Sequence, residues 1–254
     1  MVGCMKDLGY FAVLFACGGL VLLAGTPAAT AAKPQKLAVT VDDFKSGARI
    51  PGKYAFCVPA KEGHSTSGEN VNPAIRWSAG PEGTKSYAVI VVDTSVPSVF
   101  DDANKEGKTI PKGMKRIDFY HMVLVDIPPT QTEIGEGADS KGVTAKGKPP
   151  GKTDNGVRGV NDYGPAFATD DKMAGNYGGY DGPCPPWNDE RLHRYHFRVY
   201  ALDVPSLGLS GNFSGKDAVK AMHKHVLARG EVVGIYTQNP DLVAAKTRKK
   251  AKAS

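Results

Sequence analysis

The chain has 254 residues, of which 41% are hydrophobic and 23% charged, and it holds 30 Gly and 18 Pro. This composition is typical of one globular domain with many turns, and it excludes a disordered chain, a collagen and a coiled coil. The net charge is +6, but five basic residues lie in 246–254. The rest of the chain is therefore nearly neutral and offers little electrostatic basis for binding nucleic acid.

Residues 1–32 have the order of a secretory signal peptide, with a lysine near the start, an apolar run over 8–23 and small residues at the end. Ala29 and Ala31 occupy the two small positions that precede a cleavage site. We therefore expect an exported protein, periplasmic or secreted, whose domain covers 33–245. An uncleaved membrane anchor and a lipoprotein modified at Cys17 stay open as alternatives.

Cleavage of the leader removes two of the four cysteines and leaves Cys57 and Cys184. In an oxidising compartment these two residues can form a disulfide, and two free thiols are the alternative. At the other end, residues 246–254 are predicted to be a solvated basic tail, with attraction to membrane phosphates as the alternative.

Four segments have the alternation or the β-branched and aromatic content of strands, namely 37–41, 86–93, 119–127 and 195–202. The second segment is apolar on both faces, so we expect it to be central in its sheet. Residues 96–116 and 135–189 are polar and rich in Gly and Pro, and they are predicted to be long loops without core elements. Long loops on a β scaffold are where binding sites usually lie.

A single helix is predicted near the end of the chain, over residues 216–229. Val219, Met222 and Val226 recur there at helical spacing, and Gly230 follows as the residue that ends the helix. A last strand is predicted over 232–236.

Motifs of several enzyme classes are absent from the sequence. It contains neither a phosphate-binding loop ending in Gly-Lys-Ser/Thr nor a Gly-x-Ser-x-Gly elbow. His223 and His225 would point about 200° apart on the predicted helix, and His193 and His196 would face opposite sides of the predicted strand. Neither pair can hold a metal ion between its members, so we expect a protein that is not an enzyme and carries no metal or cofactor.

A set of polar and Pro-rich residues stands at the ends of the predicted strands. It comprises Asp93, His121, the loop Pro183, Cys184, Pro185 and Pro186, and His193 with Tyr195. Together with residues 67–73, 161–164 and 200–203, in this order along the chain, the set resembles the phosphatidylethanolamine-binding protein family and its bacterial YbhB/YbcL type. The resemblance extends over residues 36–238.

The resemblance implies a mainly β fold, an antiparallel β-sandwich with a few short peripheral helices, and a small anion pocket at one end. Its ligand-binding residues would be Asp93, His121, Pro183, Cys184, Pro185, Pro186, His193 and Tyr195. Two imidazoles and a phenol can donate hydrogen bonds to a phosphate, while a carboxylate can orient an imidazole or bind an ammonium group. A turn role for Asp93 and a core role for Tyr195 remain open.

The implied function is that of a non-enzymatic binding protein for a small anionic or phosphorylated headgroup such as phosphoethanolamine. The alternative is an inhibitor of a protein partner, a protease or a kinase, as in Raf kinase inhibitor-like relatives. The resemblance also allows a homodimer. Contact with a membrane would come only through the headgroup or the basic tail.

The sequence departs from the family pattern at the pocket. Thr94 and Ser95 follow Asp93 where the family usually has Asp-Pro-Asp, so the half of the pocket that would bind an ammonium group lacks one acid. Tyr120-His121 replaces the usual Trp-His pair. Three segments look like insertions that could rim or cover the mouth, namely 58–66, 99–117 and 165–177.

Overall fold

The computed structural model describes residues 35–243. The predicted leader 1–32 and the predicted tail 246–254 lie outside the described residues. The strands are β1 (Gln35–Lys36), β2 (Val39–Val41), β3 (Cys57–Pro59), β4 (Ser65–Ser67), β5 (Ile75–Trp77), β6 (Ser86–Pro97), β7 (Arg116–Ile127), β8 (Glu133–Ile134), β9 (Gly151–Thr153), β10 (Gly156–Arg158), β11 (His193–Leu202) and β12 (Val226–Tyr236). The helices are the short 3-10 helix η1 (Gly52–Tyr54), α1 (Tyr163–Ala166) and α2 (Gly215–Met222).

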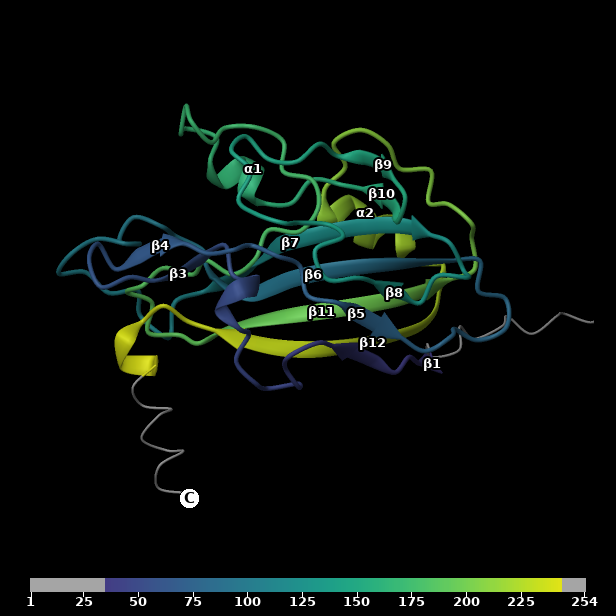
Figure 1. Ribbon diagram of the computed structural model, residues 1–254, viewed down its shortest axis with the longest axis horizontal. Helices are drawn as coiled ribbons and strands as arrows, with labels where there is room; N and C mark the ends of the chain where they lie inside the picture. The colour runs from purple at the N-terminus through teal and green to yellow at the C-terminus, as the bar shows by residue number, and fades with distance from the viewer. Residues whose placement is uncertain (1–34, 244–254) are drawn as a thin grey trace, which may run out of the picture. The chain divides into compact units, whose positions relative to one another are not determined.

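The main element of the fold is a seven-stranded sheet with the order β1-β12-β11-β6-β7-β10-β9, as Figure 1 shows from bottom to top. Its central strand is β6, as the sequence predicts. Val89 and Val91 of β6 face one hydrophobic cluster, whereas Ile90 and Val92 face another on the opposite side of the sheet. Both faces of β6 are therefore buried, which explains why this strand is apolar at nearly every position.

The two hydrophobic clusters are closed by different elements. On one side a small sheet of β2, β5 and β8 supplies Val41, Ile75, Trp77 and Ile134 to the cluster that contains Val91. On the other side α2 supplies Ala218 and Met222. A mainly β fold with few helices is confirmed, and the large sheet is mixed because β1 pairs parallel with β12. The sandwich arrangement of the sheets stays a prediction.

The helix predicted over 216–229 is only half correct. It begins with a capping box between Ser214 and Asp217, but it ends at Met222, and residues from Val226 onward belong to β12. Pairing with β11 and β1 gives these residues a ladder of hydrogen bonds that a helix would forfeit. Gly230 does not end a helix; a Cβ there would lie 2.3 Å from the Leu37 carbonyl oxygen, so the site demands glycine for close packing.

The prediction that residues 135–189 contain no core elements is wrong. This segment forms β9, β10 and α1, and its Tyr177 and Tyr180 are fully buried. In the other predicted loop Ile110 is also fully buried. These segments look polar in the sequence because their buried amides and carboxylates satisfy one another, which composition alone does not reveal.

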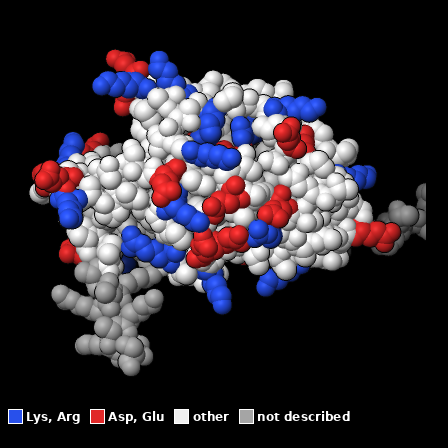
Figure 2. Space-filling view, in the orientation of Figure 1, with Lys and Arg blue, Asp and Glu red and all other residues white. Residues whose placement is uncertain are grey.

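The surface carries both signs of charge in close alternation. Figure 2 shows acidic and basic side chains interleaved over the face in view. Pairs such as Lys53 with Asp43 and Glu136 account for part of this mixing. In the part of the chain that the structure describes, none of the helices has the length and apolar character needed to cross a membrane.

Candidate functional site

The ends of three adjacent strands bring the predicted site residues together. Asp93 on β6 lies opposite Tyr195 on β11 and opposite Phe119 on β7. A cavity of about 220 Å³ opens at this end of the sheet, and it is lined by Asp93, His121, Cys184, Pro185, Pro186, His193 and Tyr195 together with Val96, Phe100, Ala103, Asn104, Phe119, Tyr163, Ala166 and Phe167. Pro183 is not in this lining, and its carbonyl accepts a hydrogen bond from the Cys57 amide at 3.1 Å.

A buried chain of alternating charges forms the β11 side of the cavity. The Nδ1 atom of His193 lies 2.6 Å from Asp93 Oδ2, and its Nε2 atom lies 3.1 Å from Asp189 Oδ2. Asp189 in turn accepts two hydrogen bonds from Arg116. All four side chains are at most 5% exposed, so each charge is neutralised by a neighbour rather than by water.

The carboxylates decide the protonation of His193. Burial by itself would lower its pKa, but Asp93 and Asp189 outweigh burial and raise the pKa of His193 to about 9. Burial likewise opposes ionisation of Asp93, but the positive charge of His193 outweighs it and lowers the pKa of Asp93. At neutral pH the pair is therefore an imidazolium between two carboxylates.

His193 lines the cavity as predicted, but its hydrogen bonds are made within the protein. Both of its ring nitrogens donate to carboxylates inside the protein, so it has no donor left for a bound phosphate. The same contacts settle the open reading of Asp93. It accepts hydrogen bonds from the Ser95 amide at 2.8 Å, as a turn residue does, and from His193. Asp93 therefore orients the imidazole and closes the turn at once.

The β7 side of the cavity holds His121 in the opposite state. Its Nδ1 atom lies 2.7 Å from the Asp181 carbonyl oxygen, and because a carbonyl only accepts, Nδ1 carries the proton. Burial lowers the pKa of His121, and the nearby Asp93 carboxylate does not offset this. His121 is therefore neutral, and its Nε2 makes no hydrogen bond to any residue that the structure describes.

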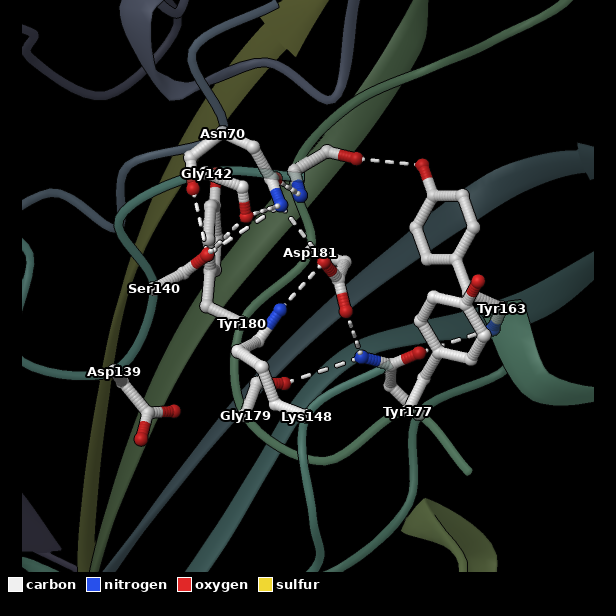
Figure 3. A network of polar contacts seen from close by, with 12 residues as sticks. Asn70, Asp139, Ser140, Gly142, Lys148, Tyr163, Tyr177, Gly179, Tyr180 and Asp181 are labelled. Atoms are coloured by element: carbon white, nitrogen blue, oxygen red, sulfur yellow. Dashed lines mark hydrogen bonds and ion pairs between the residues drawn. The ribbon is translucent and has the colours of Figure 1, made fainter. Parts of the chain in front are cut away.

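A network of buried polar groups holds the Asp181 carbonyl in place (Figure 3). The Asp181 carboxylate accepts hydrogen bonds from Asn70 at 2.8 Å, from Lys148 at 2.8 Å and from Asn161 at 2.9 Å. Its backbone amide donates to the His121 carbonyl at 2.9 Å. These hydrogen bonds hold both the side chain and the backbone of Asp181 in place. The Asp181 carbonyl therefore selects one tautomer of His121 and one orientation of its ring.

Tyr195 combines the two roles that the sequence left open. Its ring belongs to the main hydrophobic cluster, and it also lines the cavity, with its centroid 5.1 Å from that of His121. Burial raises the pKa of Tyr195 well above its usual range, and the neighbouring Asp93 adds to this effect. The phenol therefore stays protonated next to the carboxylate.

A disulfide and a braced proline loop form a further wall. Cys57 and Cys184 are joined, so of the two states that the sequence left open the structure contains the disulfide. The Gln238 side-chain amide donates to the Pro185 carbonyl at 2.7 Å. The proline rings fix φ, and the disulfide and the Gln238 hydrogen bond hold the loop in place. This wall therefore loses little conformational entropy when a ligand binds.

Sequence reasoning missed several residues of the site. Asp189 and Arg116 complete the chain of charges, and the aromatic wall comes from Phe119, Tyr163 and Phe167. No sequence signal links Arg116 to a carboxylate 73 residues away. The described residues contain no group of three or more His, Cys, Asp or Glu side chains that could hold a metal ion.

A comparison with known families identifies the class of protein. The model of the family described as phosphatidylethanolamine-binding protein matches residues 40–237. The chain belongs to this family. The predicted bacterial type is also confirmed, because YbcL and YbhB of Escherichia coli are among the matching relatives.

Individual relatives are moderately similar. A UPF0098 protein of Aquifex aeolicus is 30% identical over 197 residues, which cover 77% of this chain and 85% of the relative. A UPF0098 protein of Methanothermobacter thermautotrophicus is 32% identical over 193 residues, 76% of this chain and 93% of the relative. The crystal structure of Escherichia coli YbcL, titled a new member of the mammalian PEBP family, has 25% sequence identity and a TM-score of 0.56 over 80% of this chain and 98% of that one.

Proposed function

We propose that the protein binds a small anionic or phosphorylated headgroup in the cavity between β6, β7 and β11, without chemical turnover. The observation that carries this proposal is the unused Nε2 atom of His121. The ionised side chains of the cavity, Asp93 and His193, are paired with each other. Among the imidazole and carboxylate groups that line the cavity, His121 is therefore the one with a ring nitrogen left for a ligand.

Binding of an anion would change the protonation of His121. An imidazolium donates Nδ1–H to the Asp181 carbonyl and Nε2–H to the anion, whereas the neutral ring offers only a lone pair at Nε2. His121 therefore takes up a proton as the ligand binds, and the cost of charging a buried ring is offset by the charge-assisted hydrogen bond. The Tyr195 phenol and the aromatic rings enclose the headgroup.

A binding role is favoured over catalysis by the state of the side chains in the cavity. The sulfur of Cys184 is held in a disulfide, and His193 cannot exchange protons freely while two carboxylates hold it. Export is part of the same proposal, supported by the disulfide, since such bonds persist in oxidising compartments.

Calorimetry with sulfate tests this proposal. Sulfate keeps its charge between about pH 5 and 9, whereas phosphate gains a charge near pH 6. The affinity should be highest at the acid end, below the lowered pKa of free His121, and should decline as the pH rises through the higher pKa of the complex. Binding should also take up protons, which is measured as a difference in heat between buffers of different ionisation enthalpy.

His121→Asn is the informative variant. The Asn amide can still donate to the Asp181 carbonyl, but it lacks the Nε2 group, so sulfate affinity should fall about 10- to 100-fold. His196→Asn is the matched control, because His196 lies on β11 next to Tyr195 but faces away from the cavity and contacts Glu231. Sulfate affinity that is independent of pH, or equal losses in both variants, would contradict the proposal. So would hydrolysis of a phosphoester that His121→Asn abolishes.

A further inference from the structure

We infer that the protein docks an acidic polypeptide segment of a partner protein in a basic groove, which lies on the face of β11 and β12 opposite Tyr195. The groove has a volume of about 550 Å³, and its lining includes Lys36, Ser46, Arg198, Tyr200, Arg229 and Glu231. The linings of the groove and of the headgroup cavity share no described residue. The inference therefore goes beyond the proposed function and does not depend on it.

The pairing of three strands places donor groups in one row across the groove. Tyr200 of β11 lies opposite Arg229 of β12, and Arg229 lies opposite Lys36 of β1. Figure 1 shows these strands as neighbours at one edge of the large sheet. Partners in a ladder project from the same face of a sheet, and adjacent strands lie about 4.8 Å apart. A phenol, a guanidinium and an ammonium group therefore stand side by side.

The two cations of this row are not neutralised by the protein. Lys36 and Arg229 are exposed, and neither makes an ion pair within residues 35–243. The nearby Glu231 carboxylate is engaged by Arg198 at 3.1 Å and by His196 at 3.1 Å. Like charges directly opposite each other destabilise a sheet. An anion that lies across Lys36 and Arg229 would offset this repulsion.

The groups of the row suit carboxylates. A guanidinium donates two parallel hydrogen bonds to a planar carboxylate, and an ammonium group attracts a second one. Burial raises the pKa of Tyr200, although Arg198 and Arg229 oppose this effect, so the phenol stays protonated and can donate as well. The row therefore offers donors to more than one acidic side chain.

The charges also decide between possible occupants. Residues 246–254 of this chain carry five basic residues and no acid, so the groove would repel them. A second copy that docked through the same groove would bring like charges together. A polymer that is charged at every unit, such as polyphosphate, would place an anion beside Glu231. A polypeptide can place an uncharged residue there and its acids over Arg229 and Lys36.

Fluorescence anisotropy at low ionic strength tests the inference with two labelled peptides, one in which Glu alternates with Ser and one in which Gln replaces each Glu. The Glu peptide should bind, should lose affinity as salt is added, and should bind more tightly than the Gln peptide. Arg229→Gln and Lys36→Gln should each weaken its binding about two- to fivefold. Lys152→Gln, with the same change of charge on β9 at the opposite edge of the sheet, is the matched control.

A charge reversal gives a second, independent readout. The double variant Lys36→Glu with Arg229→Glu should lose affinity for the Glu peptide and gain affinity for a peptide in which Lys alternates with Ser. His121→Asn should leave binding of the Glu peptide unchanged, because His121 lies outside the groove.

Several results would overturn the inference. They are equal affinity for the Glu and Gln peptides, no binding of either peptide, or a loss in Lys152→Gln as large as that in Arg229→Gln. Tighter binding of polyphosphate than of the Glu peptide, with the same dependence on Arg229, would assign the groove to a uniform polyanion and exclude the polypeptide. Each of these results would leave the headgroup proposal standing, since that proposal is tested with sulfate and His121→Asn.

Discussion

Each side of the cavity buries one histidine, and the two histidines have opposite protonation states. On the β11 side, His193 is buried between two carboxylates and is charged. On the β7 side, His121 is buried against a carbonyl and is neutral. Burial disfavours the charged form of both rings, so the difference lies in the partners. A buried histidine in this fold becomes a fixed structural charge or an adjustable binding group according to what its Nδ1 atom contacts.

The largest expected effect comes from breaking the chain of charges on the β11 side. Asp189→Asn keeps the shape of the side chain but leaves Arg116 and His193 facing a neutral amide, so the free energy of unfolding should fall by about 3–5 kcal/mol. Urea unfolding at neutral pH measures this. As a control, Asp42→Asn removes a partner of the exposed Arg76 and should change little. An equal loss of unfolding free energy in the two variants would mean that the buried charges contribute no more to stability than an exposed ion pair does.

A second prediction concerns the alkaline side of the stability profile. The pKa of His193 is about 9 in the folded protein and about 6.5 when unfolded. The contribution of His193 to the free energy of unfolding is therefore fully present below about pH 6.5. It is lost as the pH rises through about 9, and the free energy of unfolding falls by about 3 kcal/mol. Urea unfolding at a series of pH values measures it.

His193→Asn should be less stable than the wild type at neutral pH and should not show this alkaline decline. His196→Asn should retain the decline. A wild-type profile that stays level up to about pH 10 would show that His193 is not charged in the fold.

The smallest expected effect lies on the acid side and concerns His121. Folding lowers the pKa of His121. The contribution of His121 to the free energy of unfolding is therefore present above the unfolded pKa of about 6.5 and is lost as the pH falls below that value. His121→Asn should abolish this decline. Saturating sulfate should oppose it as well, because the anion favours the protonated ring. An acid decline that is the same in the variant would place its origin in other groups.

The sequence was sufficient to predict the core strands β6, β7 and β11 of the large sheet and seven of the fifteen residues that line the cavity. Strand 86–93 is apolar on both faces, which itself indicates a central position, and Asp93, His121, His193 and Tyr195 stand at strand ends in the order that the family shares. The residue at which α2 ends could not be predicted from the sequence. Residues 226–229 suit a helix locally, and their pairing partners in β11 lie more than 20 residues away in the chain.

By itself, the sequence determined the family, the mainly β class and the set of side chains that meet at one end of the sheet, because strand alternation and strand-end residues are local properties. Only the tertiary structure decided the charge on each histidine. Whether an imidazole is protonated depends on which oxygens touch it, and Asp93 reaches His193 across 100 residues while Asp181 reaches His121 across 60. The same holds for Lys36 and Arg229, since strands from opposite ends of the chain bring their charges side by side.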